Sequence, residues 1–84
     1  MGKRDRVVEQ VLSGTADANV AFDDLCQLLE QLGFDVRIRG SHHLFRKSGV
    51  VERINLQRDG SKAKPYQVRQ VRQILVRYNL VEED

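Results

Sequence analysis

The segment that decides the fold reads Phe34-Asp35-Val36-Arg37-Ile38-Arg39-Gly40-Ser41-His42-His43-Leu44-Phe45-Arg46-Lys47. In its first half, apolar residues at positions 34, 36 and 38 alternate with charged residues, which is the period of a strand with one buried face. Gly40 and Ser41 are turn formers that interrupt this alternation, and residues 42–47 then resume an extended pattern. The segment therefore predicts an antiparallel hairpin.

The chain on the C-terminal side of the hairpin predicts one more strand and a helix. Residues 50–57 are expected to form a strand whose Ile54 and Leu56 point inward. A basic loop is expected at residues 62–64, after which Pro65 is well placed to begin a helix. The apolar stripe of that helix consists of Val68, Val71, Ile74, Leu75 and Tyr78.

The N-terminal side predicts two helices. Residues 22–32 carry apolar side chains at helical spacing, with acids in the first turn and Gly33 at the position of a C-terminal cap. Residues 4–12 show a shorter amphipathic pattern, followed by a polar loop at residues 15–21. The predicted fold is α+β: after the first helix it follows the α-β-β-β-α order of double-stranded-RNA-binding domains, with a three-stranded antiparallel sheet. Helices cover one face of that sheet and leave the other open to a ligand.

Length and composition allow one small domain. The chain has 84 residues, of which 40% are hydrophobic and 31% charged, a globular composition. No apolar run approaches the roughly 20 residues that span a bilayer. The single cysteine, Cys26, leaves no internal disulfide, so a cytoplasmic location is expected. Its place on an apolar stripe favours a core thiol over a nucleophile.

Charge is strongly segregated along the chain. Residues 37–77 hold eleven lysines and arginines against two acids, a net charge of +9, whereas the rest of the chain carries −7. A basic surface of this size favours binding of a phosphate backbone. The alternative is that these cations only solvate the outer faces of strands and of a helix.

His42 and His43 are the only histidines, and both lie within the basic segment. Histidine, with an unperturbed pKa of about 6.5, can take and give a proton near neutral pH, and the 2′-hydroxyl of RNA supplies a nucleophile. If Phe45 points into the core, His43 shares its side of the sheet and His42 lies on the open side. Leu44 competes with Phe45 for that core position, and a surface turn histidine without chemistry is the alternative for His42.

Three motifs carry a resemblance to a known family. Leu32-Gly33-Phe34, Gly40-Ser41-His42-His43-Leu44-Phe45 and the helix led by Lys64-Pro65 together resemble HicA, the mRNA interferase toxin of type II toxin–antitoxin pairs. The resemblance implies a small endoribonuclease of double-stranded-RNA-binding-domain-like fold that cleaves mRNA and is blocked by a HicB-type antitoxin. It also implies that His42, directly after Gly-Ser, is the catalytic residue.

The resemblance divides the chain into three parts. It covers residues 22–80, which leaves residues 1–21 as an N-terminal helix and loop and residues 81–84 as an acidic tail. The extension is expected either to cover core surface, to serve as an interaction element or to mask the site.

The resemblance and the charge pattern give the expected site. His42 transfers a proton, and no acid partner is identified for it. Neither a metal nor another cofactor is expected, because adjacent histidines without further ligands at suitable spacing do not make a zinc site. The residues expected to contact RNA are Arg37, Arg39, Gly40, Ser41, His43, Arg46, Lys47, Lys62 and Lys64. A non-catalytic RNA-binding module and a protein-interaction adaptor that uses the acidic N-terminal helices are the alternatives.

Overall fold

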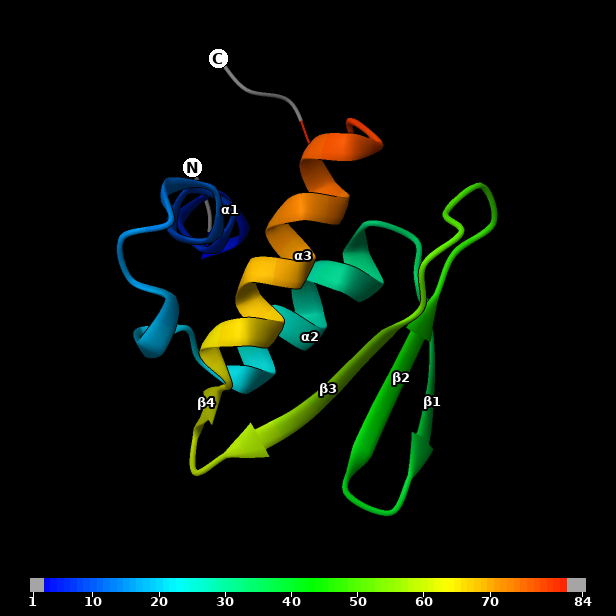
Figure 1. Cartoon of the computed structure of the whole chain (residues 1–84), viewed down its shortest axis with the longest axis horizontal. Helices are drawn as coiled ribbons and strands as arrows, with labels where there is room; N and C mark the ends of the chain where they lie inside the picture. The colour runs from blue at the N-terminus through cyan, green and yellow to red at the C-terminus, as the bar shows by residue number, and fades with distance from the viewer. Residues whose placement is uncertain (1–2, 82–84) are drawn as a thin grey trace.

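The computed structural model describes residues 3–81, so the end of the expected acidic tail, residues 82–84, lies outside the described residues. Within the described part the chain forms three α-helices and a four-stranded antiparallel sheet of order β1-β2-β3-β4 (Figure 1). The elements are α1 (Lys3–Ser13), the short 3₁₀ helix η1 (Asp17–Asn19), α2 (Phe22–Gln31), β1 (Asp35–Arg39), β2 (His42–Arg46), β3 (Ile54–Asp59), β4 (Lys62–Ala63) and α3 (Pro65–Arg77). The predicted α+β class, with an added N-terminal helix, is confirmed.

Two boundaries in the sheet differ from the prediction. The third strand was expected at residues 50–57 but begins at Ile54. The preceding backbone is held outside the sheet, because the Val50 N–H donates to the Lys47 carbonyl at 3.1 Å and the Val51 N–H donates to the Tyr78 hydroxyl at 3.3 Å. The chain from 47 to 53 is therefore a loop.

The second difference is a fourth strand where a loop was expected. Lys62 and Ala63 pair with the end of β3 and form β4. On its other side, the Ala63 N–H donates to the Val20 carbonyl at 2.9 Å, and Lys62 forms an isolated bridge with Ala21. A two-residue strand is too short to show an alternation, so its partners rather than its sequence reveal it.

Both hairpins turn on the same dipeptide. Gly40-Ser41 joins β1 to β2, and Gly60-Ser61 joins β3 to β4. The two glycines have φ of +59° and +62°. Glycine with positive φ at the first central position fits a type II′ turn, whose twist matches that of the strands it joins.

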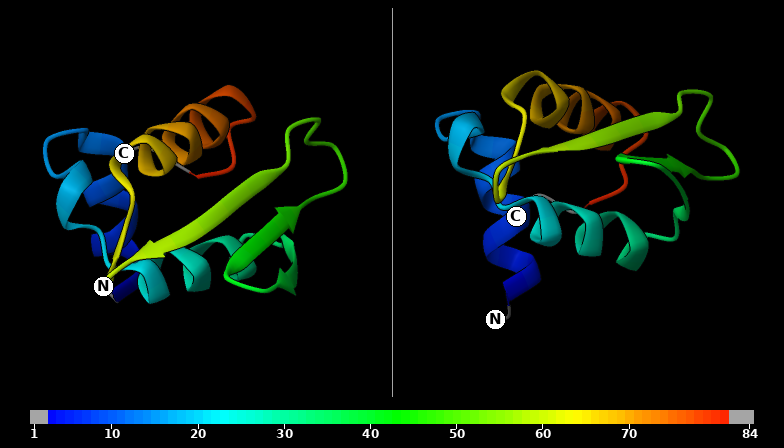
Figure 2. Two further views of the ribbon diagram at one scale, coloured as in Figure 1. Left: turned by 60° about the horizontal axis from the view of Figure 1, so that its bottom comes forward. Right: turned by 90° about the horizontal axis from the view of Figure 1, so that it is seen from below.

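The core lies between the sheet and α2 and α3, which pack on one side of β3 (Figure 2). Burying a large aliphatic or aromatic side chain of this kind stabilises a fold by about 1.5–3 kcal/mol. The largest fully buried side chains are Phe22, Leu25, Leu28 and Leu29 of α2, Val68, Val71 and Leu75 of α3, and Phe45, Ile54 and Leu56 of the sheet. The helix layer does not extend over β1, because Val36 and Ile38 are 37% and 61% exposed.

Helix α1 covers the outer side of the helix layer. Val7 and Val11 are buried in the common core, and α1 contacts α2 and α3. Arg72 of α3 holds the end of α1 and the segment that follows α1. It donates to both carboxylate oxygens of Asp17 at 2.9 and 3.3 Å and to the Val11 carbonyl at 3.1 Å. Of the expected roles for the extension, covering core surface is confirmed. Helix α1 packs against α2 and α3, and masking of the site by the extension stays a prediction.

Candidate functional site

The side of the sheet that faces away from α2 and α3 is called here the open face. Strand pairing sets its side chains in rows across β1, β2 and β3, because residues directly opposite one another point to the same side. The two rows nearest the β1–β2 turn are Arg39–His42–Gln57 and Arg37–Leu44–Asn55. His42 is exposed, whereas Phe45 is fully buried on the other side. Phe45 rather than Leu44 therefore occupies the core, as the favoured strand alternation predicted.

A hydrogen bond holds the His42 ring. Its Nδ1 lies 3.1 Å from Oδ1 of Asn55, in the adjacent row of β3. A carboxamide oxygen only accepts hydrogen bonds, so Nδ1 carries the proton in this arrangement. In the neutral ring this tautomer leaves the other nitrogen, Nε2, as the acceptor.

A second polar chain runs beside His42. Gln57, its cross-strand neighbour, donates from Nε2 to the Ser41 hydroxyl at 3.3 Å and accepts from the Lys64 ammonium at 3.4 Å. The Gln57 backbone N–H is held by Oε1 of Gln67, at 3.2 Å, and Gln67 is 3% exposed. The start of α3 is thus anchored to β3 and holds Lys64 next to the His42 row.

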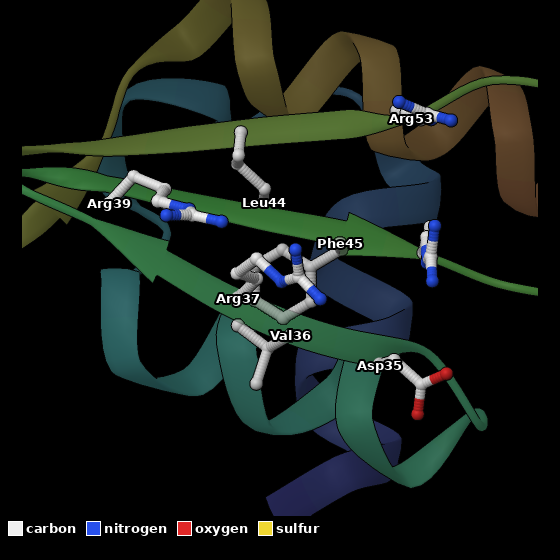
Figure 3. A pocket seen from close by; sticks show the side chains of 8 residues that line it. Asp35, Val36, Arg37, Arg39, Leu44, Phe45 and Arg53 are labelled. Atoms are coloured by element: carbon white, nitrogen blue, oxygen red, sulfur yellow. The ribbon is translucent and has the colours of Figure 1, made fainter.

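Arginines surround an open depression of about 510 Å³ on this face, and Figure 3 shows Arg37, Arg39 and Arg53 around Leu44. Within the described residues, none of the arginines that line it forms an ion pair with the protein. Their charges are therefore available to an anionic ligand. The full lining is Asp35, Val36, Arg37, Arg39, Leu44, Phe45, Arg46 and Arg53.

Other basic residues have structural partners. Arg58 pairs with Asp23 and stacks over the Phe22 ring at 4.5 Å, and Arg72 pairs with Asp17. Arg77 pairs with Glu52 at 3.0 Å. These three arginines thus bind carboxylates of the fold, whereas no ion pair is seen for the arginines of the open face within the described residues.

The expected site residues divide between two sides of the sheet. Arg37, Arg39, Arg46 and the turn residues Gly40 and Ser41 lie on or beside the open face, and Lys64 reaches it through Gln57. Lys62 is exposed and lies opposite Asp59, the last residue of β3, two residues beyond Gln57. Most of the residues expected to contact RNA are therefore on or beside the open face.

His43 and Lys47 lie on the other side. The His43 ring packs edge-on against Phe22, with centroids 5.0 Å apart, and its Nδ1 is buried without a hydrogen-bond partner in the described structure. The Lys47 ammonium lies next to Gly33 at the end of α2, 2.7 Å from where a Cβ would be. Their side chains follow the alternation of Phe45 and do not join the row of His42, so the structure does not place them with the other expected RNA contacts.

Three residues of the site were not on the expected list. Asn55 and Gln57 are neighbours of His42 only through the β2–β3 register, and Arg53 enters the depression from the end of the 47–53 loop. The outward position of Asn55 and Gln57 in β3, and of Arg53 just before it, is visible in the alternation of residues 53–57. The cross-strand pairing that gives them partners depends on the length of the 47–53 loop, which the sequence prediction placed wrongly.

The structure also answers the question of Cys26. Its side chain is buried in the core, as predicted. Burial raises the pKa of the Cys26 thiol to about 12, and the nearby carboxylates of Asp23 and Glu30 act in the same direction. A thiol with this pKa is protonated at neutral pH and is a poor nucleophile.

The described residues, 3–81, contain no group of three or more histidine, cysteine, aspartate and glutamate side chains arranged to hold a metal ion. No helix among them has the length and apolar character needed to cross a membrane.

Comparison with known proteins gives one match. The model of a protein family described as the HicA toxin of bacterial toxin-antitoxin systems matches residues 22–75, from the start of α2 to the last turns of α3. Neither a curated protein nor a solved structure matches the chain. The matched span contains His42, Asn55 and the whole sheet, and it begins after α1.

Proposed function

The chain belongs to the HicA toxin family, and from this premise we propose that it is a metal-independent endoribonuclease that cleaves mRNA through His42 and is inhibited by a HicB-type antitoxin. The observation that supports this proposal best is the position of His42. Its ring stands on an exposed sheet face among unpaired arginines, and Asn55 holds its tautomer.

RNA binds to the open face through its phosphates. Arg37, Arg39 and Arg46 supply guanidinium groups, which bind phosphate oxygens in a bidentate manner. Arg53 extends this surface from the 47–53 loop. Leu44 gives the depression an apolar floor against which a nucleobase or ribose can rest. The arrangement binds single-stranded backbone and brings one phosphate to the His42 row.

His42 then acts as the general base. Nε2 takes the proton of a 2′-hydroxyl, and the resulting oxygen forms a bond to the adjacent phosphorus. The bond from phosphorus to the 5′-oxygen of the next nucleotide breaks, and that oxygen takes a proton in the open, solvated site. The products are a 2′,3′-cyclic phosphate and a 5′-hydroxyl. Proton transfer by one positioned side chain contributes roughly 10²–10⁴-fold to such a rate.

Cations beside His42 stabilise the charge that develops on phosphorus. Arg39 lies opposite His42 in β1, and Gln57 lies opposite His42 in β3. The Lys64 ammonium donates a hydrogen bond to Gln57. Fixed positive groups of this kind stabilise developing negative charge because they are already oriented toward it before the reaction. Lys64 is thus an electrostatic partner rather than a proton donor, and the acid partner of His42 that the sequence left open stays unassigned.

Cleavage of RNA by purified protein in the presence of a chelator tests the proposal. His42→Ala is expected to lower the cleavage rate by roughly 10²–10⁴-fold, and the products of the wild type are expected to carry 2′,3′-cyclic phosphate ends. His43→Gln is the matched control, because His43 lies on the other side of the same strand. Equal rates for wild type and His42→Ala contradict the assignment of His42, and loss of activity with chelator contradicts metal independence.

The open arginine face also favours a second candidate, a non-catalytic RNA-binding module. That function predicts salt-sensitive RNA binding, unchanged by His42→Ala and without any cleavage product. Intact RNA after incubation with folded wild type, together with such binding, would favour it over the nuclease.

A further inference from the structure

Strand β1 leaves one edge of the sheet unpaired. It is the first strand in the order β1-β2-β3-β4, and all five of its residues are exposed. Figure 1 shows it along the outer side of the molecule, away from α1 and α3. An unpaired edge presents backbone N–H and C=O groups that another chain can take as a template.

The β1–β2 turn determines which backbone groups face outward. In a two-residue turn the flanking residues, Arg39 and His42, form a hydrogen-bonded pair. Such pairs alternate with non-hydrogen-bonded ones along an antiparallel ladder, so Val36 and Ile38 direct their N–H and C=O groups to the free edge. By the same alternation the Gln57 N–H points away from β2, and it donates to Oε1 of Gln67 instead. This bond agrees with the outward direction of the Val36 and Ile38 backbone groups.

The side chains along this edge alternate as strictly as its backbone. Val36 and Ile38 lie on the helix-facing side of the sheet but beyond the cover of the helices, at 37% and 61% exposure. Arg37 and Arg39 lie on the open face and are unpaired within the described residues. A strand added here therefore meets aliphatic side chains on one side and guanidinium groups on the other.

A second copy of this chain covers both Val36 and Ile38 only in a register that opposes like charges. When two β1 strands pair antiparallel so that Val36 meets Ile38 of the copy, Arg37 stands directly opposite Arg37 of the copy. Like charges in opposite positions destabilise a strand pair. A self-pair would also bring two cationic open faces together. The complement of β1 is a segment with carboxylates where β1 has arginines and aliphatic residues where it has Val36 and Ile38.

We propose that the antitoxin docks on the free edge of β1 by adding an extended segment in which carboxylate and aliphatic side chains alternate. This inference rests on the proposed function and describes how the same site is regulated. The added strand pairs with the backbone of Val36 and Ile38 and buries their side chains. Its carboxylates bind Arg37 and Arg39, which removes two phosphate-binding groups from the row of His42. RNA and antitoxin then compete for the same arginines.

The test uses the ¹⁵N-labelled full chain with His42→Ala, which can be produced without cleaving RNA. The probe is a synthetic peptide of alternating glutamate and valine, and the control peptide has the same composition in two blocks. Amide hydrogen exchange is expected to slow at Val36 and Ile38 with the alternating peptide alone. Ile38→Asp is expected to weaken peptide binding roughly tenfold or more. Val51→Asp, at an even more exposed aliphatic residue on the 47–53 loop, is the matched control and is expected to leave binding unchanged.

Each other result contradicts the docking proposal. Binding that shifts the arginine signals without protecting Val36 and Ile38 would show charge neutralisation without strand addition. Protection that rises with protein concentration in the absence of peptide would show a second copy as the occupant, and absence of binding excludes the edge. Because the peptide experiment needs no cleavage, it can fail while wild-type protein still cleaves RNA, and it can succeed when cleavage is absent.

Discussion

The two sides of this sheet use neighbouring residues of the same strands for different purposes. On the helix-facing side, Phe45 is fully buried and His43 packs on Phe22. On the open face, one residue away in each case, Leu44 lines a depression and the exposed His42 bonds to Asn55 through Nδ1. Strand alternation alone separates these roles. In so small a domain, one face of the sheet therefore stabilises the fold, and the other is free to bind a ligand.

The largest expected effect is a difference in the free energy of unfolding between substitutions on the two sides of the sheet. Phe45→Ala should lower the free energy of unfolding by roughly 3–5 kcal/mol, because it removes a fully buried ring and leaves a cavity. Leu44→Ala should cost much less, since Leu44 is already half-exposed. Urea denaturation of the His42→Ala background measures both. Similar losses for the two variants would contradict the division of the sheet into a stabilising and a free face.

The second prediction tests how the open face prepares His42. Asn55→Leu removes the acceptor that holds Nδ1, so both ring tautomers become populated and the ring is free to rotate. Cleavage should fall roughly tenfold to hundredfold, with the free energy of unfolding unchanged because Asn55 is exposed. Gln57→Leu, in the neighbouring row, is the comparison: its effect should come through Lys64 and be relieved at low salt. Full activity of Asn55→Leu would remove Asn55 from the site.

The sequence predicted the helices, the first hairpin and the side on which His42 lies, because each depends on local periodicity. Phe34, Val36 and Ile38 alternate, and the stripe of α3 repeats at helical spacing. It misplaced the start of β3 and missed β4, because those depend on pairing between distant segments. The Val51 N–H bonds to Tyr78 and the Ala63 N–H bonds to Val20, and neither partner can be read from its neighbours in sequence.

The same distinction explains the site. His42 and the arginines were found from motif, resemblance and charge. Asn55 and Gln57 were not, because they become neighbours of His42 only through the register of β2 on β3. His43 and Lys47 were included on proximity in sequence alone, and the alternation of β2 turned them to the other side.

Arginines with and without an ion pair in the described structure should differ in how they affect RNA binding. Arg37→Gln should weaken RNA binding and lower the salt dependence of log K by about one phosphate contact, roughly 0.7 in slope for a single strand. Arg58→Gln, whose guanidinium pairs with Asp23 and stacks on Phe22, should leave the slope unchanged. RNA-binding titrations at several salt concentrations measure both slopes. Equal changes would show that the basic segment acts as one diffuse charge rather than through the open face.

The fourth prediction concerns the 47–53 loop, which delivers Arg53 to the open face but is anchored on the other side of the molecule. The Tyr78 hydroxyl donates to the Glu52 carboxylate, and Arg77 pairs with the same group. The hydrogen bond from Tyr78 is the largest cause that lowers the pKa of Glu52 below its ordinary value, with a backbone hydrogen bond and the charge of Arg77 acting in the same direction.

A carboxyl group whose pKa is lower in the folded state contributes stability above its unfolded pKa, about 4.3, and loses that contribution as the pH falls through the folded value. Wild type should therefore be more stable than Tyr78→Phe at neutral pH, and the difference should shrink as the pH falls below about 4. This is the smallest of the four effects, because Glu52 is partly exposed and Arg77 still pairs with it. Tyr66→Phe, at an exposed tyrosine in the first turn of α3, is the control and should show no pH-dependent difference. If the difference between wild type and Tyr78→Phe persists at acidic pH, Tyr78 stabilises the loop through ring packing and its contact with the Val51 N–H, and the carboxylate of Glu52 is not what anchors Arg53 to the open face.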